Sequence, residues 1–139
     1  MEIRVSTKEY DVATGRIIDP EHRKVIFFIN SSEDEDFLVP LLRDMRFRML
    51  GIVHKQAEAL ELVRKHKIGV LFVDDEMQGL DVEEMLTQIQ RRHPEFHVIM
   101  FGEHITKEKL NQAVKLGAVG YLSKPLQKHS VQKIMARVV

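Results

Sequence analysis

The sequence predicts an α/β fold, a doubly wound, five-stranded parallel sheet with helices on both faces. From residue 24 onward, short apolar runs alternate with longer amphipathic runs, and the alternation occurs five times. The apolar runs are nearly continuous, as expected for strands buried on both faces, whereas the longer runs carry apolar residues at helical spacing. The length of 139 residues suits one domain with a proper core.

Each strand is expected at an apolar run bounded by polar or turn-forming residues. The first run is rich in β-branched and aromatic residues and ends abruptly in the polar segment NSSEDED. The third run is the most apolar. The five expected strands are KVIFFI (24–29), RMLGIV (48–53), IGVLFV (68–73), HVIMF (97–101) and VGYL (119–122).

The helices are expected between and after these strands, at FLVPLLRDMRF (37–47), KQAEALELVRKHK (55–67), DVEEMLTQIQRRH (81–93), TKEKLNQAVKLG (106–117) and LQKHSVQKIMARV (126–138). Ser32 and Glu35 have the spacing of a capping box for the first helix. That start would put Pro40 in the helix interior, at a cost of about 3 kcal/mol. We therefore expect the first helix to begin near Asp36. Gly117 is a typical helix C-terminus signal.

Residues 1–23 lie outside the alternating pattern and are treated as an N-terminal extension to a domain over 24–139. MEIRVS alternates like a strand and ATGR favours a turn, so either a hairpin, an added edge strand or a flexible arm is expected. The last helix ends early at Val139, which leaves room for a downstream output domain.

Composition excludes several classes of protein. Lys plus Arg and Asp plus Glu both number 21, so no net charge favours nucleic acid or an anionic membrane. No apolar stretch approaches the length of a membrane span, and the N-terminus does not resemble a signal peptide. The absence of cysteine excludes disulfides and thiolate metal sites and fits a cytoplasmic location.

Asp74 is the first candidate for chemistry, because it follows the most apolar strand. Open α/β sheets bind ligands at the carboxyl ends of their strands. Asp74, Asp75 and Glu76 fit either an inherited pocket or a solvated acidic loop with Lys124 as a counter-ion; we favour the pocket. The seven histidines have no metal-ligand spacing on one helix face and are read as surface residues. They are His22, His54, His66, His93, His97, His104 and His129.

Two segments, VLFVDDEMQGLD (70–81) and LGAVGYLSKP (116–125), resemble the receiver domain of bacterial two-component response regulators. The resemblance extends over about residues 24–137 and implies a flavodoxin-like, receiver-like fold. It also implies roles for particular residues. Asp74 takes the place of the phosphorylated aspartate, Lys124 that of the lysine that pairs with the phosphoryl group, and Asp81 falls where the family's pattern expects it.

The family holds a Mg²⁺ ion through three protein oxygens at this site. Asp74 and the backbone carbonyl of Glu76 match two of these ligands. The acidic pair expected after the first strand is replaced by Asn30 and Ser31, whose neutral oxygens should weaken Mg²⁺ binding. The acids Glu33, Asp34, Glu35 and Asp36 can substitute if the loop folds back; we favour a helix N-terminus for them, where acidic side chains suit the macrodipole.

The family's switch also departs from its pattern. The expected Ser or Thr after the fourth strand reads as Gly102, while the aromatic partner remains as Tyr121. Tyr121 is read as a strand residue at the surface or half in the core, in preference to a switching role. Gln78 and Val82 replace a common proline and glycine, and Gly79 keeps the turn flexible.

The preferred hypothesis is a degenerate receiver, or pseudo-receiver, that binds protein partners and accepts phosphoryl groups weakly or not at all. The partner face is the fourth helix, fifth strand and last helix, with Lys107, Lys109, Lys115, Tyr121, Gln127 and Lys128. A histidine kinase and a second copy are candidate partners. The alternative is a working receiver that is phosphorylated on Asp74 at a remodelled Mg²⁺ site. A phosphate-handling enzyme on the same topology lacks its motif in NSSED, so no enzyme is expected beyond self-phosphorylation.

Overall fold

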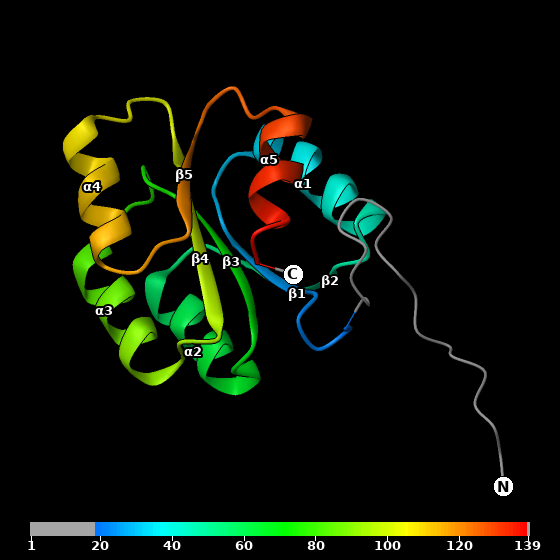
Figure 1. Ribbon diagram of the computed structural model, residues 1–139, viewed down its shortest axis with the longest axis horizontal. Coiled ribbons are helices and arrows are strands. Elements are labelled where there is room, and N and C mark those ends of the chain that lie inside the picture. The colour runs from blue at the N-terminus through cyan, green and yellow to red at the C-terminus, as the bar shows by residue number, and fades with distance from the viewer. Residues whose placement is uncertain (1–18, 139) are drawn as a thin grey trace, which may run out of the picture.

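Strands and helices alternate along the whole described chain, residues 19–138 of the computed structural model (Figure 1). The elements are β1 (Lys24–Phe28), α1 (Ser32–Asp44), β2 (Arg48–Val53), α2 (Gln56–His66), β3 (Gly69–Asp74), α3 (Val82–Arg92), β4 (Phe96–Gly102), α4 (Lys107–Lys115), β5 (Gly120–Ser123) and α5 (Lys128–Met135). Residues 1–18 of the extension expected over residues 1–23 fall outside the described part. Within that part, no helix is long and apolar enough to span a membrane.

The five strands form one parallel sheet in the order β2-β1-β3-β4-β5. This confirms the fold predicted from the alternating apolar runs. The chain winds outward from β1 in one direction to β2, and then in the other direction through β3, β4 and β5. The order therefore reverses between β1 and β3. The crevice at the carboxyl ends of these two strands is where doubly wound sheets bind ligands.

Helices cover both faces of the sheet, as expected. Figure 1 shows α1 and α5 on one face and α2, α3 and α4 on the other. Each face buries its own apolar cluster. Leu38 and Val131 belong to the cluster under α1 and α5, and Val63 and Met85 to the cluster under α2 and α3. β1 and β3 are buried along their whole length, which explains their continuous apolar sequences.

The expected start of the first helix is wrong. α1 begins at Ser32, not near Asp36, and its cap is Ser31, whose hydroxyl oxygen accepts a hydrogen bond from the Asp34 amide. Pro40 therefore lies inside the helix. Its ring removes one amide donor, but Pro40 and Asp36, four residues earlier, are both exposed, so water can solvate the freed carbonyl. The capping contact and the buried stripe of α1 outweigh the proline.

The other boundaries shift by a few residues at most. β3 includes Asp74 as its last residue, so the candidate carboxylate is held by the sheet itself. α5 is shorter than expected. The prediction for the end of the fourth helix is confirmed: α4 ends at Lys115, and Gly117 has a φ of 106°, a left-handed conformation that suits glycine.

Candidate functional site

Asp74 lies at the carboxyl end of the central strand β3, where it is only 5% exposed. Each of its two carboxylate oxygens accepts a hydrogen bond. Oδ1 accepts a hydrogen bond from the Glu76 amide at 3.0 Å, and Oδ2 accepts one from Nζ of Lys124 at 3.2 Å. The alternative of a solvated acidic loop with Lys124 as its counter-ion therefore does not fit Asp74, because this carboxylate is buried. The carboxylate is fixed inside a pocket.

Asp34 is the second carboxylate of this pocket. Its Oδ2 atom lies 2.8 Å from Nζ of Lys124, closer than Asp74 does. The contact is a close ion pair and not a well-aligned hydrogen bond, because the buried Oδ2 atom has no hydrogen-bond partner of good geometry. The preferred interpretation of the acidic segment after β1 as a helix N-terminus fits the structure. This segment forms the first turn of α1, and one of its four acids also reaches the pocket.

Lys124 follows β5 and holds the two carboxylates together. Its amide donates to the carbonyl of Gly102 at 2.9 Å, which ties it to the end of β4. Its ammonium also lies 5.3 Å from the centre of the Phe101 ring, in a cation–π contact. Burial alone would lower the pKa of Lys124, but the contacts with Asp34 and Asp74 outweigh burial and raise that pKa above its usual value. Lys124 is therefore a stable cation.

Asn30 and Ser31 do not supply a substitute acidic pair. Asn30 is exposed, and the Ser31 hydroxyl is used to cap α1. Ser31 also lines a hollow of about 440 Å³ above Lys124, together with Asp34, Glu103, Phe37 and others. Asp74 is not one of the residues that line this hollow. Asp74 contacts Lys124, which does line the hollow.

Asp75 occupies the place where the family has a hydroxyl residue. A Cβ atom built on Gly102 would lie 2.2 Å from Oδ2 of Asp75, which means that the carboxylate fills the space of a side chain at position 102. The same Oδ2 atom accepts a hydrogen bond from the Tyr121 hydroxyl at 2.6 Å. Burial, followed by this hydrogen bond and the charges of Asp75 and Asp74, raises the pKa of Tyr121 well above its usual value.

The loop after Asp74 returns the chain to α3. Asp81 is the N-cap of that helix: its Oδ1 atom accepts from the Glu84 amide at 3.0 Å, and its own amide donates to the Gln56 side chain at 2.7 Å. Gly79 has a φ of 76°, so the turn uses the conformational freedom of glycine. The position of Asp81 in the family pattern thus has a structural explanation.

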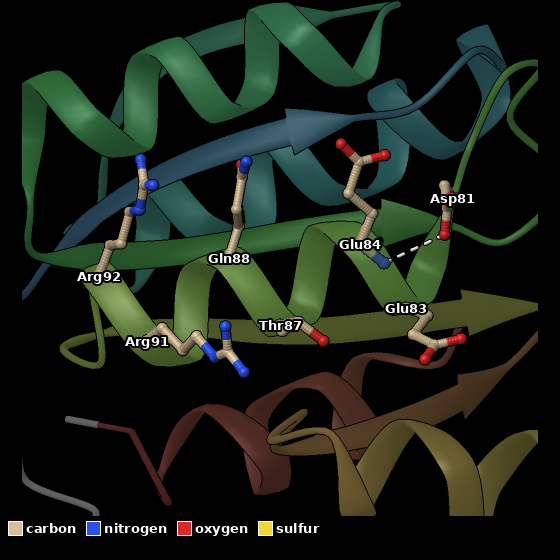
Figure 2. Close-up of a pocket in the computed structure, with 7 residues that line it drawn as sticks. All are labelled: Asp81, Glu83, Glu84, Thr87, Gln88, Arg91 and Arg92. Atoms are coloured by element: carbon tan, nitrogen blue, oxygen red, sulfur yellow. Dashed lines mark hydrogen bonds between the residues drawn. The ribbon is translucent and has the colours of Figure 1, made fainter.

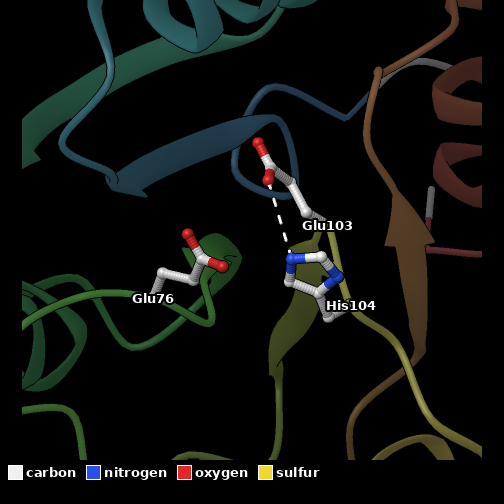
Figure 3. Close-up of side chains that lie close together, drawn as sticks. All are labelled: Glu76, Glu103 and His104. Carbon is white, nitrogen blue, oxygen red and sulfur yellow. Dashed lines mark ion pairs between the residues drawn. The ribbon is translucent and has the colours of Figure 1, made fainter.

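An exposed group of side chains lies at the mouth of the pocket. Glu76, Glu103 and His104 have potential metal-ligating atoms within 4.8 Å of one another (Figure 3). The pairing of Asp74 with Phe101 explains this, because the residues that follow two paired strands emerge side by side. His104 and Glu76 come from different loops, so spacing along one helix does not predict that they lie close together. All three side chains are exposed, so the geometry alone does not make them a binding site.

A second hollow, of about 400 Å³, lies on α3 and is separate from the Asp74 pocket. It is lined by Asp81, Glu83, Glu84, Thr87, Gln88, Arg91 and Arg92 (Figure 2). Figure 2 shows acidic side chains at one end of the helix and arginines at the other. That distribution suits the helix macrodipole and needs no ligand to explain it.

Comparison with known proteins identifies the family. The model of the response regulator receiver domain matches residues 33–136. The chain belongs to this family. The chemotaxis protein CheY of Halobacterium salinarum is 30% identical to the receiver over 110 residues, which cover 77% of this chain and 92% of that protein. The NtrC transcriptional regulator of Escherichia coli is 32% identical over 83 residues, but these cover only 18% of NtrC.

Solved structures share the fold of this receiver. The complex of CheX with CheY, BeF₃ and Mg²⁺ from Borrelia burgdorferi has a TM-score of 0.75 at 19% identity, covering 93% of this chain and 94% of that chain. A receiver domain from Clostridium thermocellum has a TM-score of 0.73 at 22% identity, covering 83% and 92%. At this identity the comparison shows the fold, and the chemistry of this receiver must be argued from its own residues.

The sequence does not predict the contacts of two residues at the site. A helix terminus is the favoured interpretation for Asp34 and a place at the site is the alternative, although Asp34 lies four residues before the buried Leu38 and on the same stripe of α1. That spacing was a signal that Asp34 points inward. Asp75 is expected in the pocket with Asp74 and Glu76, but the sequence gives it no role of its own. Its closeness to Gly102 follows from the pairing of β3 with β4, but the direction of its side chain does not.

Proposed function

We propose that this receiver is a pseudo-receiver, which acts by binding protein partners and accepts a phosphoryl group on Asp74 weakly or not at all. The observation that carries the proposal is the Asp75 carboxylate over Gly102. A phosphoryl group on Asp74 would find an anion where the family offers a hydroxyl donor. Asn30 and Ser31 supply no negative charge to hold a neutralising cation. Phosphorylation is therefore disfavoured. The hydroxyl side chain that would respond to a phosphoryl group is also missing, because residue 102 is glycine.

The proposed partner face consists of α4, β5 and α5. Among the described residues, the exposed large hydrophobic side chains are Leu110 and Val114, 37% and 52% exposed, and both lie on α4 one turn apart. Three lysines of α4, Lys107, Lys109 and Lys115, are exposed along with Glu108, and Lys128 and Gln127 are exposed at the start of α5. An apolar pair within a basic rim suits a partner protein with a complementary acidic surface. A histidine kinase and a second copy of the chain are candidates.

A Mg²⁺ ion fits the pocket only with a small donor set. The residues that would hold it are Asp74 and the backbone carbonyl of Glu76, with Asp34 as a further carboxylate, since its Oδ2 atom is buried without a hydrogen-bond partner. Mg²⁺ in proteins often uses one or two carboxylates and completes its shell with water. Its chemistry would be to neutralise phosphoryl oxygens. Lys124 already neutralises part of the charge of both carboxylates, which weakens their attraction for Mg²⁺.

The second candidate is a working receiver whose acidic site is rebuilt around Asp34. The contact of Asp34 with Lys124 favours it, because it returns a carboxylate to a pocket that lacks the usual pair. In the reaction, an oxygen of Asp74 would form a bond to the phosphorus of a phosphodonor while the bond to the donor's leaving oxygen breaks. The leaving group would depart with its electron pair, and Lys124 would pair with the transferred phosphoryl group.

Incubation with acetyl phosphate and Mg²⁺ separates the two candidates. Intact-mass spectrometry of the wild type is compared with the Asp74→Asn variant, which removes the acceptor oxygen and keeps the shape. The pseudo-receiver proposal predicts that no added phosphoryl mass accumulates on either protein. Accumulation on the wild type, absent from Asp74→Asn, supports the second candidate; its loss in Asp34→Asn would assign the rebuilt site to Asp34.

A further inference from the structure

The position of the Asp75 carboxylate depends on the absence of a side chain at residue 102. The Asp75 amide donates to the Phe101 carbonyl at 2.9 Å, which holds the start of the loop against the end of β4. From there the carboxylate lies over Gly102, with both oxygens and Cγ within 2.3 Å of where a Cβ would be. The Gly102 backbone lies outside the left-handed region, so an alanine is excluded there by Asp75 and not by backbone strain.

The same carboxylate fixes the hydroxyl of Tyr121. The ring of Tyr121 packs against the apolar cluster beneath α2 and α3, and its hydroxyl donates to Oδ2 of Asp75 at 2.6 Å. A short hydrogen bond from a phenol to a carboxylate is of the charge-assisted, stronger kind. The ring is therefore held at one end by packing and at the other by Asp75. Tyr121 lies on β5, at the centre of the proposed partner face.

We propose that Asp75 is a positioning residue for Tyr121, and that Gly102 and Asp75 are a compensating pair in which the missing side chain admits the carboxylate that fixes the tyrosine. An ionised carboxylate only accepts hydrogen bonds. Asp75 thus has no donor to turn toward a phosphoryl group on Asp74, and it stays with Tyr121. As a consequence of the contact between Asp75 and Tyr121, the partner face keeps one arrangement without phosphorylation. This consequence rests on the proposed function.

A double-mutant cycle tests whether Gly102 and Asp75 compensate each other. Gly102→Ala is introduced into the wild type and into Asp75→Ala, and the melting midpoint of each protein is measured. The proposal predicts that Gly102→Ala lowers the midpoint of the wild type and lowers that of Asp75→Ala much less, because the clashing carboxylate is gone. An equal decrease of the melting midpoint in the two backgrounds would show that Gly102 and Asp75 do not compensate each other.

The position of Tyr121 is read directly by NMR. The chain has two tyrosines, so Tyr10→Phe leaves Tyr121 as the single signal of a protein labelled with ¹³Cζ-tyrosine. In this background the Tyr121 phenol should stay protonated while the fold persists at alkaline pH. Asp75→Ala and Gly102→Ala should each shift its resonance and move its titration toward the ordinary tyrosine range, about pH 10.

Asp75→Asn is the conservative variant, and it keeps an acceptor oxygen with nearly the same shape. It should hold the Tyr121 resonance closer to that of the wild type than Asp75→Ala does. An unchanged phenol titration in Asp75→Ala, or in Gly102→Ala if the first variant does not fold, would overturn the positioning role. These measurements use the free protein without phosphodonor or Mg²⁺, so their failure is distinct from a failure of the pseudo-receiver proposal.

Discussion

Asp34 and Lys124, 90 residues apart in the sequence, form a close ion pair beside Asp74, with 2.8 Å between Oδ2 and Nζ. Both side chains are largely buried, at 11% and 15% exposure. The lysine is thereby shared between an acid from the first turn of α1 and the acid at the end of β3. This sharing stabilises the lysine cation and leaves less of its charge available to an incoming phosphoryl group.

Removal of the Asp34 charge should destabilise the protein. Asp34→Asn is expected to lower the free energy of unfolding by about 1–3 kcal/mol, the cost of leaving a buried polar partner, here the Lys124 ammonium, less well compensated. Glu33→Gln is the matched control, since Glu33 lies in the same helical turn and is exposed. It should change stability by less than about 0.5 kcal/mol. Urea denaturation measures both, and equal losses would show that only the helix macrodipole is involved.

The stability of the fold should decline at alkaline pH. The pKa values of Lys124 and Tyr121 are both raised in the folded protein. A group with a raised folded-state pKa contributes stability that is complete below its unfolded pKa, about 10 for both types, and is lost as the pH rises through the folded value. The free energy of unfolding should therefore fall above about pH 10.

The variant Tyr121→Phe identifies the tyrosine's share of that decline. Phenylalanine keeps the ring but has no proton to lose, so the free energy of unfolding of Tyr121→Phe should fall less steeply between about pH 10 and pH 11 than that of the wild type. Urea denaturation at a series of pH values gives both slopes. Identical slopes would mean that burial and the Asp75 contact together do not hold the phenol proton.

Apolar side chains in the core and on the partner face should differ in their effect on stability. Phe72 on β3 is completely buried, with its ring centre 5.7 Å from that of Phe27. Phe72→Ala should cost about 3–5 kcal/mol. Leu110→Ala on α4 should cost less than about 0.5 kcal/mol, because this leucine is partly exposed. Chemical denaturation distinguishes them. A large loss in Leu110→Ala would mean that Leu110 is a structural residue and not available to a partner.

Mg²⁺ binding should be weak and should depend on the pocket acids. A titration followed by amide shifts should show lower affinity in Asp74→Asn and in Asp34→Asn than in the wild type. Glu103→Gln is the matched control from the exposed group of Glu76, Glu103 and His104, and it should leave the affinity unchanged. An affinity that responds to Glu103→Gln but not to Asp74→Asn would place the ion at the exposed group.

The sheet could be predicted from the sequence because its strands are buried on both faces. Continuous apolar runs such as VIFF in β1 and VLFV in β3 admit few other interpretations. The start of α1 could not be predicted as well, since Ser31 and Ser32 are both suitable caps and Pro40 argued for a later start. Only the tertiary structure shows that solvent can compensate for the proline.

The site could be predicted in part. The family resemblance supplied the roles of Asp74 and Lys124, and with them the expected contact, although β4 separates the two strands that these residues follow. The contact of Asp34 with Lys124 was harder to predict, because the position of an acid in the first turn of a helix is already explained by the helix macrodipole. The position of the Asp75 carboxylate over Gly102 was the hardest feature to predict. An absent side chain at position 102 reveals only that space exists, and the residue that fills it lies on another loop.

The most direct test of the account follows the backbone amides of the wild type during addition of beryllofluoride and Mg²⁺, which together imitate a phosphoryl group on Asp74. The account predicts that the amides of Leu110, Val114 and Tyr121 keep their resonances, with any response limited to the neighbourhood of Asp74 and Lys124. A concerted shift of the α4 and β5 amides that disappears in Asp74→Asn would contradict it.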